Sequence, residues 1–136
     1  MIKEIQFQRS KQRIFAMNEN YEVVADWPCR DAFVPGYNLD GDPRGSLPNG
    51  LYTHVSAEIT DGKYGPAYGT FYITSGDPRG RDIHGGGSGL PDPYAAFQGW
   101  VPTYGCLRMQ NADGEALARM IIDSGNDVEL TVVEGW

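Results

Sequence analysis

Ile83-His84-Gly85 and Thr103-Tyr104-Gly105-Cys106-Leu107-Arg108 are the segments of this chain that carry recognisable chemistry. A thiolate is the nucleophilic form of cysteine and needs a nearby base or cation, for which His84 is the local candidate. A tetrahedral oxyanion must also be stabilised by backbone N–H groups, and Gly105 suits a tight turn that could direct them. Together the segments predict the active site of a cysteine enzyme.

The same residues also allow a plainer interpretation. Free cysteines are among the most buried residues, so Cys106 could be structural and His84 an ordinary loop histidine. The glycine-rich run from Gly85 to Gly89 lacks the Gly-Lys-Ser/Thr ending of a phosphate-binding loop, and no helical pattern follows it. We therefore expect these glycines to allow a peptide substrate, and not a nucleotide, to approach the backbone closely.

The segments also match a known pattern, in which Ile-His-Gly is followed by Ser/Thr-x-Gly-Cys-hydrophobic-Arg. Here its parts begin at Ile83 and Thr103. In these positions the chain resembles the catalytic domains of the L,D-transpeptidase family, of the YkuD type. Residues 46–52 (Ser-Leu-Pro-Asn-Gly-Leu-Tyr) are similar to the family's Thr-Pro-x-Gly-x-Tyr segment, and residues 110–113 lead into the expected helix. Tyr104 departs from the pattern, because many members have histidine there.

This resemblance implies a mechanism and a set of site residues. Cys106 would attack the amide between an L-centre and the terminal D-alanine of a peptidoglycan stem tetrapeptide, leaving a thioester. His84 would act first as the base and later as the acid. The backbone N–H groups of Gly105 and Cys106 would hold the oxyanion. The expected substrate-binding residues are Arg108, Tyr104, Gly85, Gly86 and Trp100.

Arg108 and Trp100 also have structural alternatives, a salt bridge for the first and core packing for the second. No metal or other cofactor is expected. The two histidines are too few for a convincing histidine-based metal site, and Cys-x-x-Cys spacing is absent from the sequence.

The acceptor of the acyl group is left open by the sequence. Water would make the protein an L,D-carboxypeptidase. An amine would make it an L,D-transpeptidase that forms 3→3 cross-links or exchanges amino acids. One alternative is a secreted antibacterial effector with the same chemistry, and an alternative of another class is a non-catalytic module that binds wall peptides. The expected partners are peptidoglycan stem peptides or muropeptides, and no oligomeric state is indicated.

Composition narrows the class of protein. A chain of 136 residues predicts one catalytic domain, 1–136, and a net charge of −7 argues against nucleic-acid binding. There is no long apolar run that would predict a transmembrane segment. The first nine residues lack the apolar core of a signal peptide, so a cytoplasmic location is expected, or the periplasm or cell wall for a mature fragment or delivered effector. Cys29 and Cys106 are expected to be free thiols.

Short alternating patterns predict many strands and one late helix. Turn signals fill residues 40–45 and 48–50, within a long irregular region. The helix is expected over 113–123, with Asn111 or Asp113 as N-cap and Gly125 as C-cap. The expected strands are 2–7, 12–17, 21–25, 51–59, 67–74 and 128–133. We predict a mainly β, single-domain fold, a β-sandwich or curled mixed sheet with one α-helix in the C-terminal half, which is also the fold that the resemblance implies.

Overall fold

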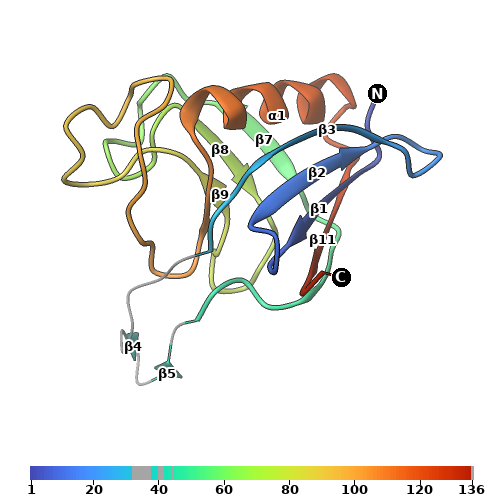
Figure 1. Cartoon of the computed structure of the whole chain (residues 1–136), viewed down its shortest axis with the longest axis horizontal. Coiled ribbons are helices and arrows are strands. Elements are labelled where there is room, and N and C mark those ends of the chain that lie inside the picture. Colours follow the sequence, from blue (N-terminus) through green and yellow to red (C-terminus); the bar gives the residue numbers. More distant parts are fainter. Residues whose placement is uncertain (32–37, 40–41, 44, 136) are drawn as a thin grey trace.

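The computed structural model describes residues 1–31, 38–39, 42–43 and 45–135. These residues form two larger β-sheets, a two-stranded ladder and one α-helix (Figure 1). The mainly β prediction is confirmed, because both larger sheets mix parallel and antiparallel pairs and the helix lies late in the chain. The helix found in these ranges falls short of the length and apolar character needed to cross a membrane.

The first sheet joins the two ends of the chain. Its order is β3-β2-β1-β11-β6, so the first strand lies between its hairpin partner and the last strand, with which it pairs in parallel. Side chains alternate between the two faces of each strand, and the apolar residues of β1, β2 and β11 point to one face. The strands are β1 (Glu4–Gln8), β2 (Arg13–Met17), β3 (Val23–Pro28), β6 (Gly50–Tyr52) and β11 (Glu129–Val133).

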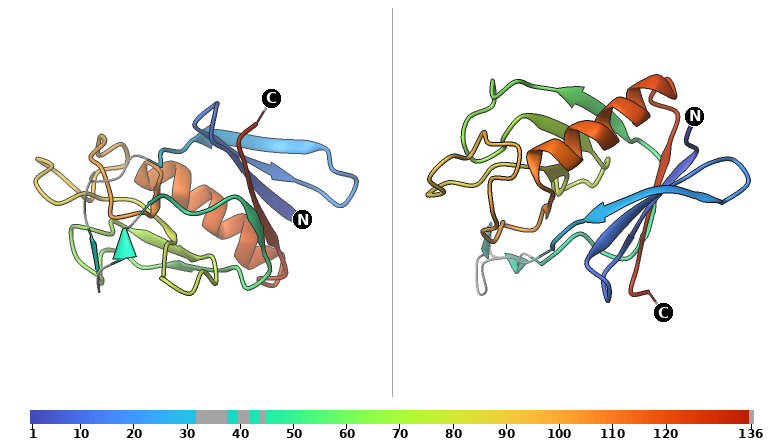
Figure 2. Two further views of the ribbon diagram at one scale, coloured as in Figure 1. Left: turned by 90° about the horizontal axis from the view of Figure 1, so that it is seen from below. Right: turned by 45° about the horizontal axis from the view of Figure 1, so that its top comes forward.

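The second sheet has the order β10-β9-β8-β7 and carries the predicted chemistry. The pair β9 and β10 is parallel, and the other pairs are antiparallel. Figure 2 shows the helix lying between this sheet and the first one. The strands are β7 (Ser56–Ile59), β8 (Phe71–Thr74), β9 (Ile83–His84) and β10 (Leu107–Arg108), and the separate ladder is β4 (Asn38–Leu39) with β5 (Asp42–Pro43).

The helix α1 (Asn111–Asp123) packs on β7 and β8, and its first residue ties three segments together. The fully buried Asn111 side chain accepts a hydrogen bond from the Thr70 N–H at 3.2 Å. Its amide donates to the carbonyls of Pro93 and Ala95 at 2.9 and 2.7 Å. The Asn111 N–H donates to Gln98 Oε1 at 2.8 Å. Because these polar groups satisfy one another, the loop of residues 93–98 is fixed to the segment just before β8.

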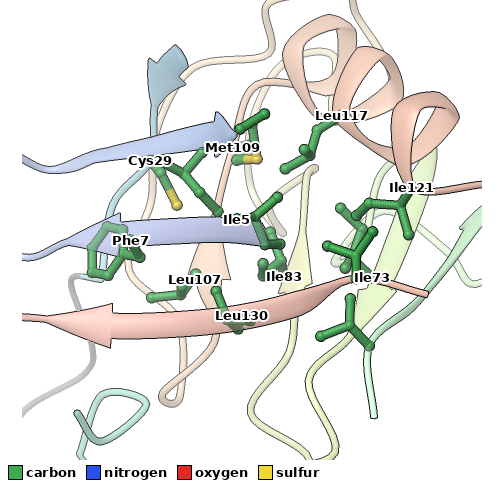
Figure 3. Packing of buried hydrophobic residues seen from close by; sticks show 14 of the residues in the cluster. Ile5, Phe7, Cys29, Ile73, Ile83, Leu107, Met109, Leu117, Ile121 and Leu130 are labelled. Carbon is green, nitrogen blue, oxygen red and sulfur yellow. The ribbon is translucent and has the colours of Figure 1, made fainter. Parts of the chain in front are cut away.

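The core lies between the helix and the sheets (Figure 3). Ile73, Ile83 and Leu107 of the second sheet are completely buried, as are Leu117 and Ile121 of the helix. Cys29 belongs to the same cluster, and it is not in a disulfide. Burial raises the pKa of the Cys29 thiol, with the nearby Asp31 charge adding to the effect. Cys29 is therefore a packing residue and has no access to a substrate.

Several predicted boundaries were wrong in an instructive way. The predicted strand 51–59 is not one central strand: it gives β6 and β7, which lie at edges of different sheets with exposed His54 between them. Residues 67–70 are turn and only 71–74 form a strand.

The helix starts at Asn111, after an N-cap residue, Gln110, whose side chain makes no capping bond. The C-cap is Ser124, and Gly125 follows it with a φ of 71°. Of the predicted turn 40–45, residues 40, 41 and 44 lie outside the described residues.

Gly114 provides a test of the helix–sheet contact. A Cβ on this residue would lie 1.9 Å from the Phe71 ring. Replacing a helical glycine by alanine normally stabilises a helix by about 1 kcal/mol. Here we expect Gly114→Ala to lower the free energy of unfolding by about 2 kcal/mol instead, because the buried Phe71 ring must move. Urea denaturation measures the change.

The control is Ala116→Gly, at an exposed position of the same helix. It should cost only the propensity difference of about 1 kcal/mol. A Gly114→Ala protein as stable as the wild type, or more stable, would contradict the packing described here.

Candidate active site

The predicted base lies in the middle of the second sheet. His84 of β9 is directly opposite Tyr72 of β8 and Arg108 of β10. Residues opposite each other share a face of the sheet, so these side chains point to the same side. Their neighbours Ile73, Ile83 and Leu107 point the other way, into the core, and Cys106 comes just before β10. The sheet thus turns one face to the core and the other to the site.

The His84 ring is held as a neutral imidazole. It is 3% exposed, and burial lowers its pKa from 6.5 to about 4, with the hydrogen bond to Gly85 acting in the opposite direction and the Arg108 charge lowering it further. Nδ1 lies 2.8 Å from the Gly85 carbonyl oxygen. Because a carbonyl only accepts, Nδ1 carries the proton and Nε2 of the neutral ring carries the lone pair.

Two tyrosines fix the plane of the His84 ring. The Tyr72 ring is parallel to it within 8°, with 6.1 Å between the centroids. The Tyr68 ring meets it edge-on at 5.0 Å. Offset parallel and edge-on arrangements are those that aromatic rings prefer. These contacts limit rotation of the imidazole.

Cys106 lies beside the strand that carries His84. The Asp82 N–H donates to Cys106 Sγ at 3.4 Å, and Sγ lies 3.8 Å from the Gly80 carbonyl oxygen. Thr103 Oγ1 donates to the Cys106 carbonyl at 2.7 Å and accepts from the Gly105 N–H at 3.1 Å. The residues before and after the thiol are therefore fixed by a compact turn.

Cys106 and His84 line one cavity of about 400 Å³. The described residues that line it include Arg81 and Arg108 but no acidic side chain. Arg81 is paired with Asp77, to which its Nε donates at 2.9 Å. Sequence reasoning found His84, Cys106, Arg108 and Tyr104 among the lining residues, and it missed Tyr68, Tyr72, Arg81 and Ser88.

A buried network beneath the thiol was also missed. The Tyr72 hydroxyl donates to the Asp82 carboxylate at 2.7 Å, and the same carboxylate accepts from the Ser75 N–H at 2.8 Å and from its hydroxyl at 3.1 Å. Burial, followed by the hydrogen bond to Asp82, raises the pKa of Tyr72 far above its usual value. The one available sequence signal was the position of Asp82, two residues before His84. Its partners come from another strand and could not be paired with it from spacing.

Arg108 orders the site loop in this structure. Its guanidinium donates to the carbonyls of Val101 and Ala67 at 2.6 and 3.3 Å. Among the described residues, its hydrogen-bond acceptors are backbone carbonyls and not carboxylates. Burial lowers the pKa of Arg108, and the nearby Cys106 opposes this effect. The charge of Arg108 stays at the cavity wall while its donors hold residues 67 and 101.

The predicted glycines have different surroundings. A Cβ on Gly105, which has a φ of 126°, would lie 2.6 Å from the Gly45 carbonyl, so this position requires glycine. Gly85 and Gly86 are buried against the chain itself: a Cβ would reach Asn111 Oδ1 at 2.1 Å or the Gly69 nitrogen at 2.4 Å. The close approach that the sequence indicated is thus made by the protein's own segments.

Tyr104 and Trp100 lie in different places. Tyr104 is 56% exposed and lines the cavity. The Trp100 ring packs under the Arg30 guanidinium at 4.3 Å and is not among the described lining residues. Leu47, in the segment that resembles the family's Thr-Pro-x-Gly-x-Tyr pattern, donates its N–H to the Gly105 carbonyl at 3.2 Å. This segment therefore supports the active-site turn directly.

Solved structures were found with the same arrangement of elements. One is the L,D-transpeptidase fragment 123–326 from Xylanimonas cellulosilytica, at 16% identity and a TM-score of 0.56, with 96% of this chain and 59% of the other covered. Another is an L,D-transpeptidase from Stackebrandtia nassauensis, at 14% identity and a TM-score of 0.59, with 97% and 55% covered. The fold is that of the L,D-transpeptidases.

A further structure with the L,D-transpeptidase fold, the avibactam carbamoyl enzyme of Ldtfm, is matched at 12% identity and a TM-score of 0.62, over 97% of this chain and 49% of that one. This chain therefore spans between 49% and 59% of the length of these three structures. No protein-family model matches the sequence, and no curated protein matches it either.

The described part of the chain holds no group of three or more His, Cys, Asp or Glu side chains arranged to bind a metal ion.

The buried neutral His84 predicts a specific pH dependence of stability. The folded protein holds His84 with a pKa of about 4, whereas the unfolded value is 6.5. Between these pH values the unfolded chain binds a proton that the folded chain does not, so stability falls as the pH falls. We expect the protonation of His84 to lower the free energy of unfolding by about 3 kcal/mol across this range, as measured by urea unfolding at a series of pH values.

The His84→Gln variant should lose this contribution and show a shallower slope between pH 6.5 and 4.5. His54→Gln is the matched control, because His54 is exposed between β6 and β7, and it should keep the wild-type slope. Equal slopes for wild type and His84→Gln would show that the ring is not held neutral.

Proposed function

We propose that this protein is a cysteine acyl-transfer enzyme that acts on the L-centre–D-alanine bond of peptidoglycan stem tetrapeptides. The observation that supports this most directly is that Cys106 and His84 line one cavity. The histidine is neutral there, and its Nδ1–H donates a hydrogen bond to the Gly85 carbonyl. The L,D-transpeptidase fold agrees with the proposal at the level of architecture.

In the first step, His84 Nε2 takes the thiol proton as Cys106 Sγ attacks the carbonyl carbon of the scissile amide. The C–N bond then breaks, and the imidazolium returns the proton to the leaving amine of D-alanine. A thioester on Cys106 is left. The low pKa of His84 keeps the imidazole neutral at neutral pH, so Nε2 can accept the thiol proton as the attack takes place.

The oxyanion of the tetrahedral intermediate forms beside the 103–106 turn. We assign its stabilisation to backbone N–H groups of Gly105 and Cys106, as the sequence predicted. The Gly105 N–H donates to Thr103 Oγ1 in the present structure, so it would be shared with, or released from, that hydroxyl during catalysis. The Asp82 N–H at 3.4 Å favours the thiolate in the same way, because a donor stabilises negative charge on sulfur.

The charge of the cavity favours an anionic substrate. Asp77 balances Arg81, whereas the recorded partners of Arg108 in the described chain are carbonyl groups. A buried cation with neutral partners leaves positive potential at the cavity wall. The terminal carboxylate of a tetrapeptide carries the complementary charge.

Hydrolysis or aminolysis completes the reaction. Attack by water, with His84 Nε2 accepting its proton, releases a tripeptide carboxylate and restores the thiol. Attack by an amine releases a cross-linked or exchanged peptide by the same proton transfers. We propose water as the principal acceptor, which gives L,D-carboxypeptidase activity. Location in the cytoplasm, or in the periplasm or cell wall for a mature fragment or effector, stays a prediction.

The test is mass spectrometry of the protein incubated with a stem tetrapeptide at neutral pH under reducing conditions. We expect wild type to release D-alanine and form tripeptide. Cys106→Ala should lower the rate by at least about 1,000-fold, because no nucleophile remains. His84→Gln should lower it by about 100-fold or more, through loss of the base.

Cys29→Ala is the matched control, since it removes the other thiol and should leave the rate within about threefold provided that the protein stays folded. A cross-linked peptide dimer among the products would show that the acceptor is an amine and not water. An intact tetrapeptide in all samples, and no covalent adduct between Cys106 and avibactam, would reject acyl transfer. Equal tetrapeptide binding by wild type and Cys106→Ala would then support the non-catalytic module.

A further inference from the structure

A second cavity adjoins the candidate active site. It has a volume of about 430 Å³, and the described residues that line it are Glu58, Tyr64, Tyr68, Tyr72 and Thr74. Tyr68 and Tyr72 also line the cavity that holds Cys106 and His84. The two cavities therefore meet at these tyrosines, and we call the second one the tyrosine groove.

The tyrosine groove is aromatic but not aliphatic. The Tyr64 and Tyr68 rings each have a centroid 5.9 Å from that of Tyr72, at angles of 76° and 57° to its plane. Tyr64 is 48% exposed and Tyr68 is 39% exposed. Every described lining residue also carries a polar group. A partner helix would need aliphatic surface, which the lining side chains do not offer.

The charges of the tyrosine groove are balanced internally. Lys63 is ion-paired with Glu58, and its ammonium lies 5.2 Å from the centroid of the Tyr64 ring. The Tyr64 hydroxyl donates to the other Glu58 oxygen at 2.8 Å. A cationic ligand would have to displace Lys63 from both the carboxylate and the ring. An anionic ligand would meet the Glu58 carboxylate, so a neutral ligand fits best.

We propose that the tyrosine groove binds a neutral saccharide ring. The faces of a pyranose carry C–H groups that pack on aromatic rings, and its rim carries hydroxyl groups. The exposed tyrosine rings provide the first kind of contact. The Glu58 carboxylate has acceptor positions beyond those used by Lys63 and Tyr64, and the tyrosine hydroxyls provide further partners. The combination matches both parts of a sugar.

The inference deepens the proposed function, on which it rests for the identity of the full substrate. A saccharide attached to the peptide would occupy the tyrosine groove while the peptide end lies at Cys106. The groove residue Tyr64 would then be a specificity residue that distinguishes glycosylated from bare peptides. Tyr64 itself is not among the residues that line the catalytic cavity.

The binding test uses the ¹⁵N-labelled Cys106→Ala protein, in which no turnover occurs, and N-acetylglucosamine trisaccharide as the probe. NMR titration should shift amide signals of residues 56–59 and 63–74. Tyr64→Ala, made in the same background, should weaken binding about fivefold, the scale of one aromatic contact. Tyr21→Ala removes a 72% exposed tyrosine on the β2–β3 turn and should leave binding unchanged.

Lysine amide, a small cation, serves as the competing probe. The inference is overturned if the trisaccharide causes no shifts, if Tyr64→Ala binds it as tightly as its parent, or if lysine amide binds the groove in its place.

A kinetic comparison separates this inference from the proposed function. With catalytically active protein, Tyr64→Ala should lower kcat/KM about fivefold for a disaccharide-tetrapeptide and leave that for the bare tetrapeptide unchanged. If both peptides are cleaved and Tyr64→Ala has no effect, the saccharide site is refuted while the proposed enzymatic function is supported. If the saccharide binds but neither peptide is cleaved, the saccharide site is supported while the proposed enzymatic function is refuted.

Discussion

The pairing of β9 with β8 and β10 is the constraint on which the structure depends. This pleat places Ile73, Ile83 and Leu107 in the core while Tyr72, His84 and Arg108 face the cavity. A shift of one residue would exchange the two sets, burying an arginine and exposing three large apolar side chains. The hydrophobic core therefore fixes the register, and the register places His84 on the cavity that Cys106 also lines. The same strand pairs thus determine both the packing of the core and the lining of the cavity.

Sequence reasoning succeeded where the information was local. The strands β1, β2 and β11 and the helix α1 follow from apolar periodicity, and the mainly β fold class follows from the order of the predicted elements. The positions of His84 and Cys106 on one cavity were also predicted, from the family pattern. Long-range pairing was not accessible in this way. The run 51–59 is rich in β-branched and aromatic residues, and nothing in it indicates that β6 joins one sheet and β7 the other.

The remaining site residues illustrate the same limit. Tyr72, Ser75 and Asp82 are ordinary residues in sequence and become a network only when β8 lies beside β9. Trp100 was expected at the substrate, whereas the structure stacks it on Arg30. Arg108, the arginine of the sequence pattern, donates to carbonyls of two loops. Its side chain therefore orders the cavity wall and also places a positive charge there. The sequence pattern indicated the candidate residues, and packing determined what each of them contacts.

The parallel pairing of β1 with β11 has a consequence for how the chain reaches this state. Residues Glu4 and Glu129 are adjacent in the sheet but lie at opposite ends of the sequence. Contacts of such high sequence separation slow folding, because a large loop must close before they form. During synthesis the β1–β3 hairpins can form early, yet β1 lacks its parallel partner until β11 has been made. Strand β1 therefore depends on a strand far along the chain to complete its sheet.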